Sequence, residues 1–323
     1  RSGRVNKKYK FIDLFAGIGG LRIPFDEAGV CVFTSEKDAH ARSTYQQFFT
    51  NDLHSIDTDV TKFSDSVPND FPDHDLLLAG FPCQPFSHAG KRLGFEDTRG
   101  TLFFSIANIV KHKQPKVVLL ENVKGLLNHD SGHTFATILA TLEELGYVSH
   151  HQVLNARDFG LPQNRNRLFI VAIRKDVNGA STYSFPPPSH DRNELRVGDF
   201  LEPEAAVKYT ISDRLWAGHK ARKSKNVAKG TGFGYQMVDH DSNYTATLSA
   251  RYYKDGSEIL VAQGNQNPRK ITPREASNLQ GFPPNFAPNK SDIQAYKQFG
   301  NAVPVSVIRA IAQTLSVYLE IRD

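Results

Sequence analysis

The sequence predicts an α/β protein with a doubly wound, mostly parallel sheet and a smaller second domain inserted into it. Over the first half of the chain, short apolar runs with the length of buried strands alternate with helical stretches. The composition changes after the stiff run Phe185–Ser189, because glycines, aromatic residues and basic residues interleave in the segment that follows it. The 323 residues, 39% of them hydrophobic, can bury the core that this architecture needs.

Composition and charge limit the class of protein. Two cysteines are too few for a disulfide framework or a thiolate metal cluster, and the 12 histidines show no ligand spacing, so we expect no metal. Arg1–Lys10 lacks the apolar core of a signal peptide, and no apolar run approaches the roughly 20 residues of a membrane helix. We therefore expect a cytoplasmic protein. The net charge of +5 favours polyanionic partners only weakly, but Arg214–Lys229 is rich in Lys and Arg and has no acidic residue.

The first predicted strand, Lys10–Phe15, runs into the glycine-rich turn Ala16–Gly20 and then into a predicted helix over Leu21–Ala28. Such a corner lets a nucleotide approach the backbone closely. The dinucleotide fingerprint is absent because Arg22 stands where its third glycine would be, and the sequence contains no P-loop. The turn therefore favours a nucleotide ligand and disfavours NAD.

Acidic residues follow the next two predicted segments. The strand Val30–Ser35 ends at Glu36, which is placed to accept hydrogen bonds from ribose hydroxyls. After a predicted helix around Ala39–Phe49, Asp59 is placed to accept from an adenine amino group. For Glu36 taken alone, a surface glutamate remains the alternative.

Cys83 stands in the sequence Gly-Phe-Pro-Cys-Gln-Pro-Phe-Ser, directly after the predicted strand Asp75–Ala79. Pro82 and Pro85 fix their own φ angles and restrict the residues before them, so the loop is stiff. A stiff loop suits a nucleophile that must meet an electrophile at a fixed angle. An arbitrary free cysteine is more often an inert core residue, and the neighbouring motifs decide against that alternative here.

Further polar residues are predicted at the same edge of the sheet. Glu121 ends the strand Lys116–Leu120, and the carboxyl ends of parallel strands are where open α/β sheets hold their ligands. Arg165 and Arg167 are spaced to reach one side of the site, although a surface ion pair is the alternative. The remaining elements predicted for this half of the chain are helices over Leu102–Lys113 and Thr134–Leu145 and strands near Val148–Asn155 and Leu168–Ile173.

These motifs, in this order, resemble the DNA (cytosine-5) methyltransferase family over most of the chain. The resemblance implies the fold of S-adenosylmethionine-dependent methyltransferases, S-adenosylmethionine as methyl donor and double-stranded DNA as partner. It implies catalytic roles for Cys83, Glu121, Arg165 and Arg167, with Arg165 among the groups expected to favour the Cys83 thiolate. The residues that match the family's cofactor site are Phe15, Gly17, Ile18, Gly19, Glu36, Lys37, Asp59, Val60, Pro82, Asn301 and Val303, although Lys37 replaces an aromatic residue found in many members.

The same resemblance predicts the domain organisation and the DNA contacts. Residues 1–188 would form the catalytic and cofactor-binding domain, 189–270 the target-recognition domain, and 271–323 the return to the catalytic domain. A helix beginning at Thr272 and a closing helix over Val307–Leu319 are predicted in the last part. The candidate DNA-binding residues are Ser87, Lys91 and Arg92, in a loop expected to close over the flipped base, and Lys229, Tyr235, Thr247 and Arg251 in the target-recognition domain.

Three functions follow from these patterns. The leading one is methylation of carbon 5 of a flipped-out cytosine in a specific duplex sequence, by a nucleoid-associated monomer in a restriction-modification system with a cognate endonuclease. The second is the same chemistry on tRNA, and the third is a silent DNA-binding regulator, which the intact Cys83, Glu121 and Arg165 disfavour. Lys229–Tyr235 and Leu248–Leu260 resemble relatives that modify sites of the CCNGG or CCWGG type.

Overall fold

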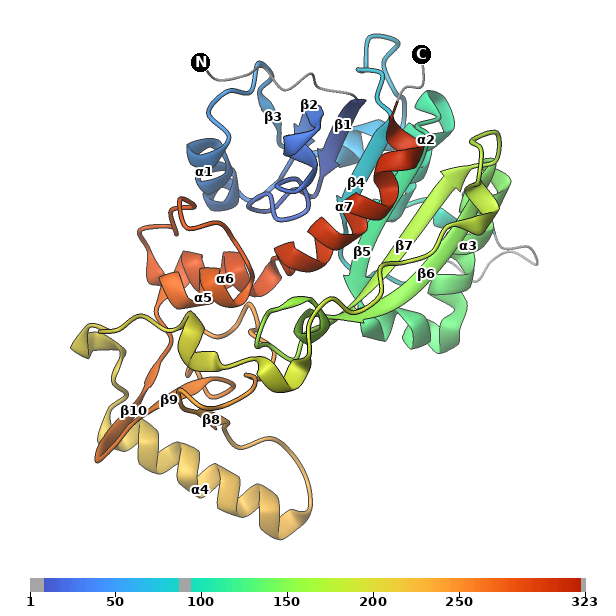
Figure 1. Ribbon diagram of the computed structural model, residues 1–323. Helices are drawn as coiled ribbons and strands as arrows, with labels where there is room; N and C mark the ends of the chain where they lie inside the picture. Colours follow the sequence, from blue (N-terminus) through green and yellow to red (C-terminus); the bar gives the residue numbers. More distant parts are fainter. Residues whose placement is uncertain (1–8, 87–93, 321–323) are drawn as a thin grey trace. The chain divides into compact units, whose positions relative to one another are not determined.

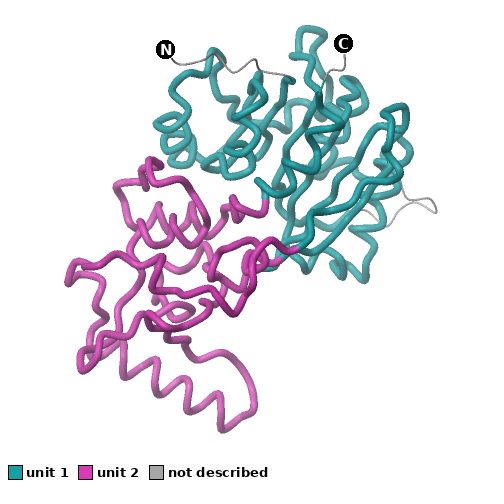
Figure 2. Tube along the Cα trace, viewed as in Figure 1, with its two compact units in different colours: residues 1–154, 166–187, 308–323 teal, residues 155–165, 188–307 magenta. Residues whose placement is uncertain are grey.

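The computed structural model describes residues 9–86 and 94–320, which form two compact units (Figures 1 and 2). The first unit comprises residues 1–154, 166–187 and 308–323, and the second comprises residues 155–165 and 188–307. The predicted DNA contacts Ser87, Lys91 and Arg92 lie outside the described residues.

The first unit is built on a seven-stranded sheet with the strand order β3-β2-β1-β4-β5-β7-β6. Neighbouring strands from β3 to β5 pair in parallel, whereas β7 runs antiparallel to β5. The predicted doubly wound, mostly parallel sheet is thereby confirmed. The direction of the strand order reverses between β1 and β4. The strands are β1 (Tyr9–Leu14), β2 (Gly29–Ser35), β3 (Ile56–Asp57), β4 (Leu76–Gly80), β5 (Val117–Val123), β6 (Tyr147–Asn155) and β7 (Asn166–Arg174).

Helices cover both faces of this sheet because successive strand residues point to opposite sides. Alternate residues such as Leu77, Ala79, Val118 and Leu120 pack into one core together with α2 and α3. In Figure 1, α7 crosses the opposite face in front of β4 and β5, and α2 and α3 lie behind the sheet. The helices named for this unit are α1 (Ala39–Phe48), α2 (Leu102–Lys113), α3 (His133–Glu144) and α7 (Val305–Leu319), whose first residues belong to the second unit.

The prediction of a helix over Leu21–Ala28 is wrong. Only a single 3-10 turn, Phe25–Glu27, forms there, and Pro24 precedes it as the N-cap. The backbone N–H groups of Arg22 and Ile23 both donate to the carbonyl of Gly19, so the glycine turn extends further along the chain than the pattern suggested. The amphipathic pattern reflects inward-pointing side chains of a compact turn, not a helix face.

The second unit combines a small sheet of strand order β10-β9-β8 with three α-helices. The helix α5 begins at the predicted N-cap, where Thr272 and Glu275 form a reciprocal capping box. The elements are α4 (Asp213–Lys229), β8 (Met237–Val238), β9 (Leu260–Gln263), β10 (Gln266–Lys270), α5 (Pro273–Leu279) and α6 (Asp292–Asn301). Short 3-10 helices complete both units, at Val60–Ser64, Phe95–Thr98, Lys124–Gly132, Ala156–Phe159, Ala180–Thr182, Arg192–Glu194, Val197–Phe200 and Val207–Tyr209.

The boundaries of the second unit differ from the predicted domain limits. Its long segment starts at Pro188, next to the predicted boundary, but it extends to Val307 and so includes most of the segment expected to return to the catalytic domain. Ile271 explains this extension: its N–H donates to the Tyr252 hydroxyl, and its carbonyl accepts from the Tyr296 hydroxyl. These buried bonds tie α6 and the start of α5 into the same core.

Within residues 9–86 and 94–320, one helical stretch, Asp292–Leu319, is long and apolar enough to cross a membrane by length and composition. This finding differs from the expectation that no such run exists. Half of its most apolar window is buried inside the protein, and a core helix of a soluble protein meets the same test. The stretch is therefore weak evidence for a membrane span.

Candidate active site

The loop that carries Cys83 is anchored on both sides of the cysteine. On the N-terminal side, the carbonyl of Phe81 accepts a hydrogen bond of 2.8 Å from the Asn122 side chain, which follows Glu121 in β5. The rings of Phe81 and Phe86 pack against Phe103 of α2, with centroids 5.5 and 5.9 Å apart. These contacts hold the loop to the core while Cys83 stays partly exposed between them.

The Cys83 thiol lies in an environment that favours its protonated form. Burial raises the pKa of Cys83. This differs from the sequence-based prediction of a site that favours the thiolate. The neighbouring Gln84 accepts from the N–H of Leu102 at 3.0 Å, at the start of α2, and so fixes the loop without supplying charge to the sulfur.

Glu121 and Arg167 form an ion pair at the carboxyl end of the sheet. Their atoms Oε1 and Nε are 3.3 Å apart, and both side chains are largely buried, at 12% and 14% exposed. Glu121 lies opposite Gly80, the last residue of β4 before the cysteine loop. A Cβ atom on Gly80 would come within 3.1 Å of the carboxylate. The strand register therefore brings the carboxylate, the arginine and the base of the Cys83 loop together in the first unit.

Burial of Arg167 disfavours the charged form of its guanidinium. Burial lowers the pKa of the Arg167 guanidinium, and the negative charge of Glu121 acts in the opposite direction. Arg167 also donates to the carbonyl of Asn166 at 2.8 Å. The pair thus provides a fixed carboxylate in a partly desolvated setting, where its electrostatic effect on a bound group is large.

Arg165 has other partners than those expected of it. Its side chain is fully buried, and it belongs to the second unit. The terminal nitrogens donate to the side chain of Gln163 and to the backbone carbonyls of Leu248, Gly300 and Ala302, at 2.7 to 3.3 Å. These contacts give Arg165 a structural role, holding three segments of the second unit together. The predicted role in favouring the thiolate stays a prediction, because Arg165 and Cys83 belong to different units.

The glycine turn offers a cradle for a nucleotide. Glu36 accepts the N–H of Gly17 and the N–H of Asp38, both at 2.7 Å. Phe15 and Gly17 have positive φ angles of 51° and 55°, and a Cβ atom added to Gly17 would meet nothing within 4 Å. A ligand can therefore approach this backbone closely, as the cofactor prediction requires. The carboxylate of Glu36 retains acceptor positions beyond the two amides that it binds.

The other predicted cofactor residues have varied settings. Asp59 accepts from both the N–H and the hydroxyl of Thr61, at 3.0 and 2.6 Å, and these bonds lower its pKa. In the first unit, Ile18, Gly19 and Val60 are buried, while Lys37 and Pro82 are exposed. Asn301 and Val303 belong to the second unit, so their place in the pocket stays a prediction.

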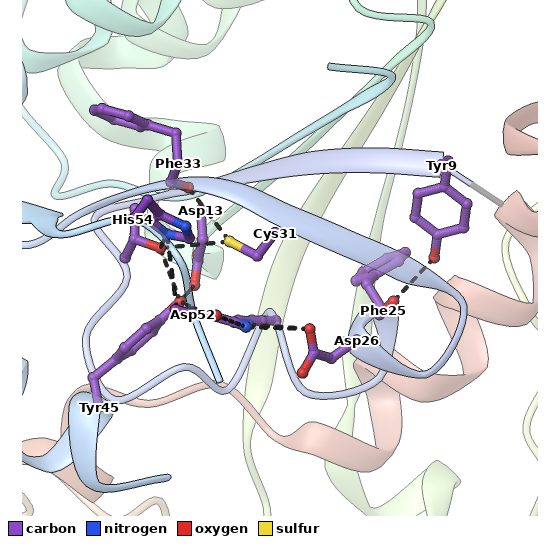
Figure 3. A network of polar contacts seen from close by, with 11 residues as sticks. Tyr9, Asp13, Phe25, Asp26, Cys31, Phe33, Tyr45, Asp52 and His54 are labelled. Carbon is purple, nitrogen blue, oxygen red and sulfur yellow. Dashed lines mark hydrogen bonds and ion pairs between the residues drawn. The ribbon is translucent and has the colours of Figure 1, made fainter. Parts of the chain in front are cut away.

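A buried polar network beneath the glycine turn was missed by sequence reasoning (Figure 3). Arg22 donates to Asp52 and to the Tyr45 hydroxyl, which in turn donates to Asp13 at 3.0 Å. Asp13 is fully buried, and burial raises its pKa to about 7. The only signals in the sequence were an aspartate inside an apolar strand and an arginine in place of a glycine.

Two of the predicted DNA-binding residues of the second unit lie at α4: Lys229 ends the helix, and Tyr235 packs against it. Lys229 and Arg251 are exposed. Tyr235 packs edge-on against Trp216, with ring centroids 4.9 Å apart. The hydroxyl of Thr247 donates to the carbonyl of Asn164 at 2.6 Å, within the second unit, and its contact with DNA stays a prediction.

A mostly parallel seven-stranded sheet, with a glycine turn after β1, an acidic residue after β2 and a cysteine loop after β4, defines a methyltransferase-like protein. Solved structures share this fold. The chain resembles a Dnmt2 methyltransferase of S. pombe, with a TM-score of 0.75 and 21% identity over 96% of this chain and 99% of that one. It also resembles the Entamoeba histolytica methyltransferase EhMeth, with a TM-score of 0.72 and 19% identity over 98% and 100%.

Residues 9–316 match the C-5 cytosine-specific DNA methylase family, and the chain belongs to that family. It is 56% identical to the type II methyltransferase M1.ScrFI of Lactococcus lactis subsp. cremoris, over 98% of this chain and 80% of the relative. It is 52% identical to the type II methyltransferase M.NlaX of Neisseria lactamica, over 96% and 97%. The chain is a DNA cytosine-5 methyltransferase of the restriction-modification type.

Proposed function

We propose that this enzyme acts through a covalent bond between Cys83 and carbon 6 of a flipped-out cytosine in a specific duplex sequence. The observation that carries the proposal is the register that sets Glu121 beside Gly80, at the base of the Cys83 loop. Carbon 5 of cytosine is a poor nucleophile, so a methyl donor alone does not suffice. Addition of a thiolate to carbon 6 makes carbon 5 enamine-like and nucleophilic.

Glu121 gives a proton to ring nitrogen 3 and later takes it back. The Cys83 thiol first gives its proton to water. As the thiolate bonds to carbon 6, Glu121 in its protonated form gives its proton to nitrogen 3, so that negative charge does not build up on the ring. After methylation, the carbon 5 proton leaves to a base, the carbon–sulfur bond breaks, and nitrogen 3 returns its proton to Glu121. Arg167 orients the carboxylate throughout, because its Nε lies 3.3 Å from Oε1.

S-adenosylmethionine, when bound, supplies the methyl group that carbon 5 attacks. The residues proposed to hold it are those around the glycine turn. Glu36 would accept from the ribose hydroxyls, Asp59 from the adenine amino group, and the backbone of Gly17 would allow close approach. The open space where a Gly17 Cβ would project supports this assignment.

The DNA duplex is proposed to lie against α4. His219 is the buried residue of this helix, and its basic residues are exposed. Lys220 and Lys223 are held over aromatic rings, with Nζ 5.2 Å from the Trp216 ring and 4.3 Å from the Tyr235 ring. Side chains oriented in this way present their charges to a phosphate backbone at a reduced entropic cost.

Arg222 contributes differently from its neighbours on α4. It bonds to Asp255 at 3.1 Å and to the carbonyl of Gly234 at 3.0 Å, so it anchors the glycine-rich loop after the helix. Lys229, Tyr235, Thr247 and Arg251 are proposed to belong to the same DNA-contacting surface. A sequence of the CCNGG or CCWGG type remains the proposed target.

A cognate endonuclease acting on the same site, a monomeric state and association with the nucleoid belong to the same proposal. The relatives' name, type II methyltransferase, is compatible with such an endonuclease. A monomer suits the chemistry, because one target base is engaged at a time.

Transfer of labelled methyl from S-adenosylmethionine to duplex DNA, with tRNA in parallel, tests this function. We expect label in DNA that is lost in Cys83→Ser, and sequencing of the product would give the site. Label in tRNA alone would overturn the proposed substrate and keep the chemistry. Tight DNA binding without any label would instead favour the silent regulator.

A further inference from the structure

Arg22 forms a buried ion pair that neither the catalytic chemistry nor the cofactor contacts require. It is 3% exposed, and its two terminal nitrogens meet the two carboxylate oxygens of Asp52, each at 2.6 Å. The guanidinium also donates to Asp26 at 3.2 Å and to the Tyr45 hydroxyl at 3.1 Å. Such a bidentate pair fixes both distance and orientation, which an ammonium group cannot do.

The same arginine packs against the ring that supports the glycine turn. Its guanidinium carbon lies 3.9 Å from the centroid of the Phe49 ring. A Cβ atom on Gly19 would lie only 2.3 Å from that ring, so the turn rests directly on it. The N–H of Arg22 donates to the carbonyl of Gly19 at 3.0 Å and closes the turn. Phe49 is therefore held between the turn and the arginine that ends it.

The glycine turn is thus held at both ends. At its start, the N–H of Gly17 donates to Glu36 after β2. At its end, Arg22 is bound to Asp52, in the segment that follows α1. Figure 3 shows Asp52 on this segment, with Tyr45 and Asp13 nearby. The two attachments come from different parts of the chain, so together they set the shape of the turn.

We propose that Arg22 and Asp52 are positioning residues for the nucleotide cofactor. The pair presets the glycine turn in the shape that receives the ligand, so that binding does not have to order it. The inference rests on the proposed cofactor site, since it assigns these two residues to that site without contact to the ligand. Loss of the pair should weaken cofactor binding and leave the chemistry at Cys83 unchanged once cofactor is saturating.

The variants Arg22→Lys and Asp52→Asn, and their combination, test this proposal in the full chain. Arg22→Lys keeps the charge and loses the bidentate geometry, and Asp52→Asn keeps the shape and loses the charge. The matched control is Lys175→Gln, which removes an exposed ion pair with Glu143 in the same unit. The measurements are the dissociation constant of S-adenosylhomocysteine, KM and kcat, DNA affinity, and hydrogen exchange of the peptide spanning residues 15–24.

We expect each single variant to bind S-adenosylhomocysteine about tenfold more weakly, with faster hydrogen exchange in the turn. The double variant should be no weaker than the worse single one, because the pair acts as a unit. The kcat at saturating cofactor and the DNA affinity should stay within about twofold of the unaltered enzyme.

Folded variants that bind S-adenosylhomocysteine as tightly as the unaltered enzyme would overturn the inference and leave the proposed function intact. A fall in kcat with unchanged cofactor affinity would overturn it too. If the unaltered enzyme and the Lys175→Gln control both fail to bind, the proposed cofactor site itself is wrong. If Arg22→Lys does not fold, the isosteric Asp52→Asn decides alone, through its dissociation constant and the exchange of residues 15–24.

Discussion

Arg167 on β7 and Glu121 on β5 are joined across two antiparallel strands, with Nε and Oε1 3.3 Å apart. The register places Val123, two residues beyond the glutamate, opposite Arg167. The arginine side chain therefore reaches back along the strand to the carboxylate. Because the pair is largely buried, the direction of the carboxylate is set by the sheet, and small changes at either residue should affect catalysis before they affect folding.

Glu121→Gln should abolish most methyl transfer. The amide keeps the shape and a hydrogen-bond acceptor but cannot deliver a proton to ring nitrogen 3, so we expect kcat to fall about 10²- to 10⁴-fold. Single-turnover methylation of duplex DNA measures the effect, and circular dichroism checks the fold. A Glu121→Gln enzyme with nearly full kcat would show that the carboxyl plays no part in proton transfer.

Arg167→Lys should lower kcat less than Glu121→Gln does. Lysine preserves the charge but not the Nε geometry that orients the carboxylate. When the two substitutions are combined, the losses should not add, because both act on one carboxyl group. A double-mutant cycle on kcat provides the measurement, and additive losses would mean that the two residues act independently.

Alkylation of Cys83 by iodoacetamide should accelerate as pH rises. Burial raises the pKa of this thiol, so at neutral pH the folded enzyme holds it mainly protonated, and the reactive thiolate appears only as pH approaches the raised value. Cys31 should stay unreactive over the same range, since burial raises its pKa to about 12. Mass spectrometry of the two cysteine peptides between pH 6 and about 9 tests this. A fast, pH-independent reaction at Cys83 would show that the thiolate is already favoured.

Arg165→Met should destabilise the second unit. The guanidinium binds the carbonyls of Leu248, Gly300 and Ala302, and removing it takes a donor from each, although Ala302 keeps a bond of 3.3 Å from Gln280. We expect the free energy of unfolding, measured with urea, to fall by about 1 to 3 kcal/mol for each acceptor left unsatisfied. If the variant is as stable as the unaltered protein but inactive, Arg165 has the catalytic role that the sequence suggested.

Replacing Lys220 and Lys223 with alanine should reduce the salt dependence of DNA binding. Each lysine that contacts a phosphate contributes about one unit to the slope of log affinity against log salt, so we expect the slope to fall by about two. Lys208→Gln in the same unit is the control, because Lys208 is paired with Asp292. An unchanged slope in the double variant would remove α4 from the DNA-contacting surface.

Much of the first unit could be predicted because its signals are local. Apolar runs with turn residues at their ends marked β4 and β5, and Glu121 was visible as the first polar residue after one of them. The pairing of Glu121 with Arg167 required the antiparallel register of β7, which a pattern cannot supply. The helix prediction for the segment after Gly20 failed for a related reason, because the apolar spacing of this segment arises from a compact turn.

Contacts between distant parts of the chain explain the remaining differences. Arg22 and Asp52 are 30 residues apart, and nothing in the sequence shows that they pair. Arg165 and Arg167 look equivalent in the sequence, but the boundary between the two units falls between them. Arg165 belongs to the second unit, and Arg167 belongs to the sheet of the first. Only the tertiary structure separates the structural arginine from the one beside the carboxylate.

The covalent adduct at Cys83 is the central claim, and duplex DNA carrying 5-fluorocytosine tests it most directly. Fluorine at carbon 5 cannot leave as a proton does, so the carbon–sulfur bond formed before methylation should persist. With S-adenosylmethionine present, we predict a stable protein–DNA complex that digestion and mass spectrometry locate at Cys83, and no complex with Cys83→Ser. Methylation of ordinary duplex DNA by the unaltered enzyme without any adduct on the fluorinated duplex would contradict the account.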